Sequence, residues 1–582
     1  MDLIKSISSK TEFKTNEKLE WELLLTPNWF DLILNPFDTS LFKVIATFKD
    51  PKGKSKEVYG FYFEDYSFEF EQNKDVNSKG IWGESSTNLN EPQGIETYKR
   101  VGEPKYLIRH IVKEEGLYNL TINIYFNNEV IKQIKESFEV QKGDNISKGV
   151  LQIDELNKRN FKFSNNETFI PIGQNNAWFT SPTRKTIDYQ VWFKLMEENG
   201  ANFTRIWLNT KSFALHSGDD FKNFKTRMVN AKMLDKVIDL AKEHNIYFML
   251  TLLQHGQFSE KVNPAWQYNN WNKINGGILD KPWEFFTNNE AKKIYKEQLI
   301  YIVSRWGYLE NLAAWELFNE VDWTDNYSSE KVSLWHQEMA QFIKRIDNYN
   351  HLVTTSYKHL KGEGYYLKEI EYANPHSYDY FNKNINIEVP KNIKMLYKKY
   401  QKPILHSEIG IDWRTGLGTA EKDPLGITIK QSQWAGVMGG SAGGAMNWWW
   451  DSFVHPLNLY HHFKGISNFS KNMDMISNKY VLLSELKDLR ISSKDIKIIG
   501  YLLDDRVYGY LFHKNWTYQN KIKEDNKITI YMPLSDGNYQ LQIFDTTLGI
   551  VEETSLIKAV NNEVEFKLII KEDKAFIIKK VK

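Results

Sequence analysis

The feature that most constrains the fold is a regular alternation of strand and helix patterns between about residues 150 and 490. Short apolar runs alternate there with amphipathic segments such as Lys232–His244. Eight such units predict a (β/α)8 barrel with long loops at the carboxyl ends of its strands. A doubly wound open sheet is the alternative, but it would ordinarily carry a Gly-rich phosphate turn after its first strand, and none is present. The strands expected in chain order are 169–173, 202–208, 246–253, 313–320, 351–356, 371–378, 403–408 and 443–451.

Both ends of the chain have a different pattern, in which short, partly alternating strands are separated by turns rich in Pro, Gly, Asn and Asp. We therefore predict an α/β fold class, with an N-terminal β-sandwich over 1–147, the barrel over 148–490 and a smaller C-terminal β-sandwich over 491–582. The N-terminal sandwich is expected to pack against the barrel, with carbohydrate binding as the alternative role. The C-terminal sandwich is expected to be structural.

Composition and charge exclude several classes of protein. The net charge is +1 and no long basic run occurs, which argues against nucleic acid or an anionic membrane as a main partner. The absence of cysteine excludes disulfides, thiolate metal sites and cysteine nucleophiles. No apolar h-region follows Met1, and no apolar run of 18 or more residues occurs. We therefore expect a cytoplasmic protein, or a secreted one whose leader has been trimmed from this sequence.

Two glutamates stand at the ends of apolar barrel strands. Glu320 follows the run that begins at Ala313, and Glu408 closes the run that begins at Pro403. Active sites of such barrels lie at the carboxyl ends of the strands, and the fourth and seventh strands lie across the barrel mouth, so both carboxylates can point into one cleft. Retaining hydrolysis of a glycosidic bond requires two such groups about 5–5.5 Å apart, one as acid and one as nucleophile. Each glutamate alone could instead form an ion pair or cap a helix.

The sequence Asn319-Glu320 at the end of strand four and Glu408 at the end of strand seven resembles the acid/base and nucleophile pattern of glycoside hydrolase clan A. The resemblance covers the barrel and is closest to family 5-like enzymes that carry an N-terminal β-sandwich. It implies that Glu320 is the general acid/base, that Glu408 is the nucleophile and that Asn319 binds the sugar 2-hydroxyl. It also implies supporting roles for Arg205 beside Glu408, for His376 and Tyr378 from strand six, for His255 after strand three and for Trp448 beneath the central sugar.

Some of these residues have plainer interpretations. Arg205 could form an ion pair at the core edge, and His376 could satisfy a backbone group. Alternation along a strand lets only one or two of the rings in 448–450 face the barrel interior. Glu316 shares the inward face with Glu320 but lies deeper, which predicts a buried partner role. The loop acids Asp322, Asp412 and Asp451 are further candidates for contact with substrate.

We therefore expect a retaining β-glycoside hydrolase that acts on carbohydrate by double displacement, with no cofactor and no metal. Exo-action on short β-galactosides, β-glucosides or β-mannosides is favoured, because long loops after strands three and eight could block one end of the cleft. Endo-action on a β-linked polysaccharide is the alternative. A non-catalytic carbohydrate-binding barrel is the alternative from another class, although binding alone does not need the glutamate pair. Serine hydrolysis is disfavoured because no Gly-x-Ser-x-Gly elbow occurs.

Overall fold

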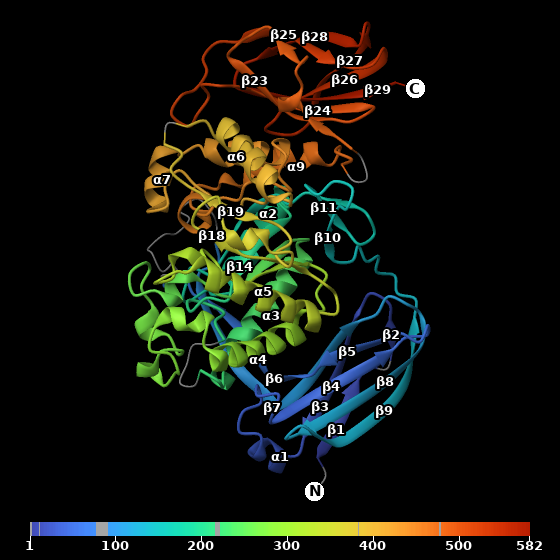
Figure 1. Ribbon diagram of the computed structural model, residues 1–582, viewed down its shortest axis with the longest axis vertical. Coiled ribbons are helices and arrows are strands. Elements are labelled where there is room, and N and C mark those ends of the chain that lie inside the picture. Colours follow the sequence, from blue (N-terminus) through green and yellow to red (C-terminus); the bar gives the residue numbers. More distant parts are fainter. Residues whose placement is uncertain are drawn as a thin grey trace.

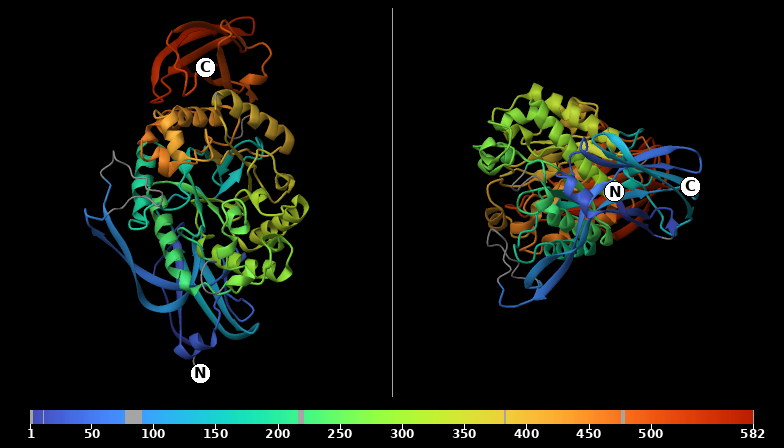
Figure 2. Two further views of the ribbon diagram at one scale, coloured as in Figure 1. Left: turned by 90° about the vertical axis from the view of Figure 1, so that its left-hand side faces the viewer. Right: turned by 90° about the horizontal axis from the view of Figure 1, so that it is seen from below.

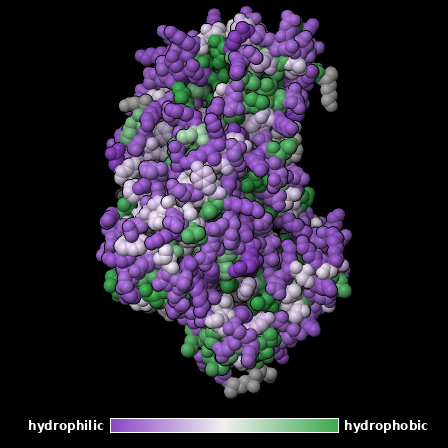
Figure 3. Space-filling view, viewed as in Figure 1, coloured by the Kyte–Doolittle hydropathy of each residue, from purple (hydrophilic) through white to green (hydrophobic). Residues whose placement is uncertain are grey.

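The computed structural model describes residues 3–10, 12–76, 91–215, 221–381, 383–475 and 479–581. Three regions follow one another along the long axis, with the N-terminal sheets at one end, the barrel in the middle and the C-terminal sheets at the other end (Figure 1). The face seen in this view is largely hydrophilic (Figure 3). Within the described ranges, no helix combines the length and the apolar character that a membrane span requires.

The N-terminal region consists of a four-stranded sheet of order β1-β3-β7-β6 and a five-stranded sheet of order β2-β9-β8-β4-β5. Trp21 of β3 contacts the rings of Phe48 in β4 and Phe138 in β9, so the two sheets pack face to face. Strict alternation of buried and half-exposed residues along β3 reflects this one-sided burial. The strands are β1 (Ile4–Ser9), β2 (Phe13–Lys14), β3 (Lys18–Leu25), β4 (Phe42–Lys49), β5 (Ser55–Tyr59), β6 (Phe61–Gln72), β7 (Gly94–Ile111), β8 (Gly116–Phe126) and β9 (Glu129–Gln141), and the short helix α1 spans Pro27–Leu32.

Strands β6 and β7 form a long hairpin that runs from the N-terminal sheets along the side of the barrel (Figure 2). Glu96 of β7 is fully buried, accepts a hydrogen bond from the Thr186 amide at 2.8 Å and pairs with Lys236 at 2.5 Å. Nearby, Glu91 pairs with Arg184 and with His455. The hairpin is therefore anchored on the barrel by buried ionic contacts.

The central strands pair in parallel in the order β13-β14-β15-β16-β17 and β18-β19-β20, as expected for a barrel. Asn447 forms single parallel bridges to Gln174 of β13 and to Ile409 of β20, which join the first and last of these strands. The strands are β13 (Gly173–Asn175), β14 (Phe203–Trp207), β15 (Tyr247–Thr251), β16 (Leu312–Glu316), β17 (Leu352–Thr354), β18 (Ser356–Tyr357), β19 (Asn374–Ser377) and β20 (Glu408–Ile409). The helices are α2 (Ile187–Glu198), α3 (Met228–Glu243), α4 (Asn289–Trp306), α5 (Ser329–Ile346), α6 (Ile385–Tyr400), α7 (Gly416–Lys422), α8 (Ile427–Met438) and α9 (His462–Ser470).

Three predicted barrel strands differ clearly from the structure. The seventh, 403–408, is a strand only over Glu408–Ile409 (β20), preceded by a single bridge at Ile404. The eighth, 443–451, is not a continuous strand: the chain makes single bridges at Asn447 and a π-helical turn over Trp450–Val454. Backbone hydrogen bonds still join the segment to both neighbours, for example from the Met446 amide to His406 and from the Asn175 amide to Asn447, and the Gln433 side chain donates to the carbonyls of Ala445 and Gly173. The first strand begins at Gly173 rather than at Phe169, because Thr168–Phe169 (β12) belongs to a small antiparallel sheet with β10 (Leu151–Ile153) and β11 (Phe161–Phe163).

The C-terminal region contains a six-stranded sheet of order β21-β23-β24-β29-β26-β27 and a three-stranded sheet of order β22-β25-β28, which share one hydrophobic cluster. Lys430 of α8 pairs with Asp573 at 3.0 Å and thereby connects this region to the barrel. The strands are β21 (Val481–Leu482), β22 (Arg490–Ile491), β23 (Ile496–Leu502), β24 (Arg506–His513), β25 (Asn526–Pro533), β26 (Gly537–Phe544), β27 (Val551–Ala559), β28 (Glu563–Ile570) and β29 (Asp573–Lys580).

Candidate active site

Glu320 and Glu408 meet at the carboxyl edge of the barrel. Glu408 is the first residue of β20, and Glu320 lies four residues beyond the end of β16, with its backbone in the left-handed region at φ 46°. One carboxylate oxygen of each glutamate and one ring nitrogen of His376 lie within 4.8 Å of one another. The two acids therefore face a common space, at a separation that one sugar ring can bridge.

Arg205, at the centre of β14, connects the deeper residues of the site. Its guanidinium makes two hydrogen bonds to Glu316, at 2.6 and 2.7 Å, and one to Glu408 at 2.5 Å. It also donates to the Asn319 side-chain oxygen at 2.7 Å. The Arg205 and Glu316 side chains are completely buried. Glu316 therefore holds the guanidinium in place by two hydrogen bonds, and the guanidinium in turn fixes the position of Glu408. The prediction that Glu316 is a buried partner agrees with this contact.

His376 and Tyr378 reach the glutamates from the sixth strand. His376 Nδ1 lies 2.9 Å from Glu320 Oε1 and 3.4 Å from Glu408 Oε2, while its Nε2 contacts the Ser407 hydroxyl at 3.0 Å. The Tyr378 hydroxyl donates to Glu408 Oε2 at 2.7 Å. Burial lowers the pKa of His376 to about 4, so the imidazole is neutral between the two acids.

His255 and Asn319 lie on the other side of Glu320. His255 Nδ1 is 3.5 Å from Glu320 Oε2 and 3.4 Å from the Asn319 amide nitrogen, and its Nε2 contacts the Asn263 side chain at 3.0 Å. Burial lowers the pKa of His255 to about 3. A neutral His255 therefore belongs to the same cluster as the residues predicted from strands two, four, six and seven.

The two glutamates have different surroundings. Burial raises the pKa of Glu320 to about 8, and the nearby Asp322 adds to this increase while Arg205 opposes it. Burial also raises the pKa of Glu408, but the charge of Arg205 and the hydrogen bond from Tyr378 act to lower it. At neutral pH Glu320 is protonated, as a general acid must be, and Glu408 is the carboxyl group with direct partners for its ionised form.

Trp448 belongs to an aromatic cluster beside the glutamates. Its backbone N–H bonds to Ile409 of β20, and its ring packs against Trp207 and Trp178 at centroid distances of 5.1 and 5.6 Å. Trp448 and Trp449 are partly exposed, whereas Trp450 is buried against Trp178. Trp448 therefore offers the exposed aromatic surface that the resemblance assigned to it.

Several contributors to the site were not predicted. Asn175 donates to the backbone carbonyls of Ser407 and Asn447, Trp178 packs under Trp448, and the Ser356 hydroxyl accepts from the Glu320 amide. Asn175 is the last residue of β13 and Trp178 follows shortly after it, so their position at a strand end was a usable signal. Ser356 offers no signal, because a single serine in an apolar run is common in buried strands.

Glu320, His376 and Glu408 are also the residues that could share a metal ion, judged over the part of the chain that the structure describes. Each already has a protein partner, since Arg205 and Tyr378 bind Glu408, and Ser407 binds His376. The described residues His455, His461 and His462, which lie near one another in sequence, do not form such a group with acidic residues in the described ranges.

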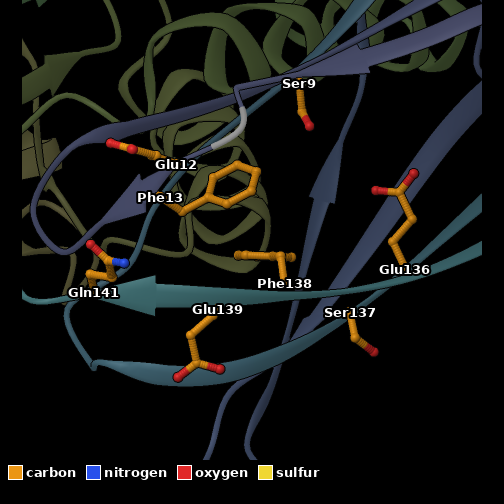
Figure 4. Close-up of a pocket in the computed structure, with 8 residues that line it drawn as sticks. All are labelled: Ser9, Glu12, Phe13, Glu136, Ser137, Phe138, Glu139 and Gln141. Atoms are coloured by element: carbon orange, nitrogen blue, oxygen red, sulfur yellow. The ribbon is translucent and has the colours of Figure 1, made fainter.

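A separate pocket of about 590 Å³ lies in the N-terminal sheets, and neither Glu320 nor Glu408 lines it. It is lined by residues of β1, β2 and β9 together with Glu12. Phe13 and Phe138 lie close together in it, whereas Glu139 points away from them (Figure 4). Its acidic side chains do not converge on a common point, in contrast to Glu320 and Glu408.

Comparison with known proteins agrees with the geometry of the barrel. No family model matches the chain. A mannan endo-1,4-beta-mannosidase of Solanum lycopersicum is 29% identical over 174 residues, which are 25% of this chain and 41% of that protein. One of Oryza sativa subsp. japonica is 32% identical over 140 residues, 22% of this chain and 29% of that protein. These similarities support assignment of the chain to glycoside hydrolase clan A.

The similarities agree with the predicted resemblance and support a glycoside hydrolase as the class of enzyme. The chain spans less than half the length of the two mannosidases described above. A provisionally assigned glycoside hydrolase from Bacteroides vulgatus ATCC 8482 has the same fold with a TM-score of 0.64 at 15% identity, over 98% of this chain and 100% of that chain. Another solved glycoside hydrolase matches with a TM-score of 0.51 at 14% identity, over 74% of this chain and 97% of that chain.

Proposed function

We propose that the protein is a retaining β-glycoside hydrolase that acts by double displacement on β-linked glycans. The observation that carries this proposal is the approach of Glu320 and Glu408 to within 4.8 Å in unequal surroundings. A short separation leaves room for one anomeric carbon and no intervening water, which favours the retaining route. A protein that only binds carbohydrate has no need for this pair.

In the proposed first step, Glu408 attacks the anomeric carbon while protonated Glu320 gives its proton to the departing glycosidic oxygen. The products are a glycosyl ester of Glu408 and a free leaving-group alcohol. In the second step, Glu320 takes a proton from water, which attacks the same carbon and releases Glu408 as a carboxylate. Arg205 and Tyr378 favour the ionised nucleophile because both donate hydrogen bonds to it.

Asn319 is proposed to donate to the sugar 2-hydroxyl, and Trp448 to lie beneath the sugar ring at the cleavage point. His376 and His255 are proposed to orient Glu320, since each contacts one of its oxygens. Stacking on Trp448 would bury apolar surface of the sugar, while the hydrogen bond from the Asn319 amide would fix the orientation of the sugar.

The substrate is proposed to be a β-linked glycan, with endo-action on β-mannan as the specific candidate. This candidate is supported by the names of the similar mannan endo-1,4-beta-mannosidases. The exo-action expected from the long loops is not confirmed, and it stays a prediction. We also propose that the flanking β-regions, over 1–147 and 491–582, fold as sandwiches that support the barrel.

The test is turnover of β-mannan, β-mannooligosaccharides and aryl β-mannosides, β-glucosides and β-galactosides, with analysis of early products. Endo-action on mannan predicts a mixture of oligosaccharides and a rapid fall in viscosity. Monosaccharide as the sole early product would favour exo-action. Failure to cleave any member of the panel would contradict the proposed function.

A further inference from the structure

We propose that Ser356 is a positioning residue that holds the general acid/base Glu320 and the amide of Asn319 in their working orientations. This inference rests on the proposed function, because it assigns Ser356 a part in that reaction. The serine does not face the reacting atoms directly. It acts through the two neighbouring residues that follow β16.

Ser356 makes hydrogen bonds to three consecutive residues, Phe318, Asn319 and Glu320. Its hydroxyl accepts the backbone N–H of Glu320 at 3.0 Å and donates to the side-chain oxygen of Asn319 at 3.3 Å. Its own backbone N–H bonds to the carbonyl of Phe318 at 3.0 Å. Ser356 is completely buried, so water does not substitute for it in this arrangement.

The conformation of Glu320 explains why such a clamp is needed. Its φ of 46° and ψ of 50° place a non-glycine residue in the left-handed region, which side chains with a Cβ adopt only when the surroundings enforce it. The hydrogen bond from the Glu320 amide to Ser356 is available in this conformation. Loss of the acceptor therefore removes one of the contacts that hold the carboxyl group between His376 and His255.

The same hydroxyl determines which way the Asn319 amide faces. Asn319 Oδ1 accepts from Ser356 and, at 2.7 Å, from Arg205. Two donors on the oxygen place the amide nitrogen on the opposite side, 3.4 Å from His255 Nδ1. The amide nitrogen is thus presented as a donor toward the cleft, where a sugar hydroxyl would accept from it.

The experiment compares Ser356→Ala with Thr355→Val, which removes a buried hydroxyl at the adjacent position. Thr355 bonds to the Phe318 carbonyl and to His336, so its loss tests the effect of a missing buried hydrogen bond alone. Aryl β-glycosides that differ in leaving-group acidity are the substrates. We expect Ser356→Ala to lower kcat/KM about 10- to 100-fold for poor leaving groups and less than about threefold for good ones, because only the poor ones need the acid.

The pH dependence of kcat/KM gives a second readout, which a general loss of stability does not change. A released Glu320 segment comes closer to solvent, so we expect the alkaline limb of kcat/KM to shift to lower pH in Ser356→Ala and not in Thr355→Val. Ser356→Cys, which keeps the volume but bonds weakly, should show the same selective loss if the alanine variant does not fold. An equal loss on all leaving groups, or an unchanged profile, would overturn the inference.

Failure of the inference is distinct from failure of the proposed function. If the wild-type protein cleaves no glycoside, the proposed function fails, and titration of Glu320 by carbon NMR then tests Ser356 without turnover. A lower Glu320 pKa in Ser356→Ala than in Thr355→Val supports the clamp. An identical pKa in the two variants contradicts it.

Discussion

Glu320 and Glu408 are the same residue type, and their surroundings give them different chemistry. Among the residues that the structure describes, Glu320 has no direct cationic partner, and its carboxyl group contacts two neutral histidines. Glu408 instead accepts hydrogen bonds from an arginine and a tyrosine. This difference separates an acid that keeps its proton from a carboxylate that can attack.

The Glu320 pKa of about 8 predicts the alkaline limb of kcat/KM. Because the acid must be protonated, activity should fall above this pKa as the proton is lost, while the acidic limb of the profile belongs to Glu408, which must be ionised. Asp322 raises the Glu320 pKa by charge repulsion, so Asp322→Asn should shift the alkaline limb to lower pH. Glu363→Gln, an exposed neutralisation on a neighbouring loop, is the control and should leave the limb in place. A shift to higher pH in Asp322→Asn would contradict the electrostatic account.

At the residue scale, the site residues were easiest to predict where a charged residue interrupts an apolar strand. Glu320, Glu408 and Arg205 stand out because charged residues are rare in buried strands. Glu316 was recognised as a buried partner from its parity with Glu320. Ser356 was not foreseeable, because its role depends on the left-handed backbone of Glu320, which has no signature in a non-glycine sequence.

At the scale of elements, Arg205 ties together three strands of the barrel. It comes from β14 and binds Glu316 of β16 and Glu408 of β20, all with little or no exposure. Asn374 of β19 and Thr251 of β15 complete the hydrogen bonds of Glu316, at 3.2 and 2.5 Å. A buried polar network therefore connects these strands at the carboxyl edge of the barrel.

Arg205→Met should destabilise the protein by about 3–5 kcal/mol, because it leaves buried carboxylates without their partner. It should also abolish most of the activity, since Glu408 would then hold its proton to higher pH. Arg205→Lys keeps the charge but loses the fork and should lie between methionine and wild type. Urea denaturation and pH–rate profiles are the measurements. If Arg205→Met had the same free energy of unfolding as the wild type, the polar network would not be what stabilises the carboxyl edge of the barrel.

Helices and strands were predicted correctly where the hydrophobic periodicity of the sequence was regular over a long segment. The barrel strands and the amphipathic helix α3 followed their patterns, and parallel pairing agreed with the expected barrel. The strand predicted over 443–451 is confirmed only in part, because backbone hydrogen bonds join Gly444, Met446 and Trp448 to the neighbouring strands but the chain turns into a π-helix at Trp450. Strands β9 and β27 leave little apolar alternation to detect in the sequence, because most of their residues are exposed and polar or charged.

At the scale of the whole molecule, the N-terminal sheets are joined to the barrel by buried charge. Asp235 of α3 bonds to Arg305 at 2.7 Å and to the Trp306 indole at 2.8 Å, and it lies 3.8 Å from Arg109 of β7. Although burial raises its pKa, Arg305 and Arg109 lower the pKa of Asp235 to about 2. This long-range contact could not be predicted from sequence, because its partners are far apart in the chain.

Asp235→Asn should lower the free energy of unfolding by about 3 kcal/mol at pH 7, because buried Arg305 loses its counter-charge and Arg109 is left with its pair to Glu20. The Asp235 pKa is depressed in the folded state, so its stabilisation is complete above the unfolded pKa near 3.8 and is lost as pH falls through about 2. The difference between variant and wild type should therefore shrink below about pH 4. Glu103→Gln, which removes the exposed pair with Lys5, is the control and should change stability by less than about 1 kcal/mol. A pH-independent difference would contradict the linkage.

The most direct test of the central claim is the stereochemistry of glycosyl azides formed by variants of the two glutamates. In Glu408→Ala, azide should enter the space left by the carboxylate and give an α-glycosyl azide from a β-glycoside with a good leaving group. In Glu320→Gln, azide should instead attack the glycosyl ester of Glu408 and give the β-azide. Proton NMR of the anomeric centre distinguishes these products. The reverse assignment, or an undiminished rate in Glu408→Ala, would contradict a shared anomeric centre with Glu408 as the nucleophile.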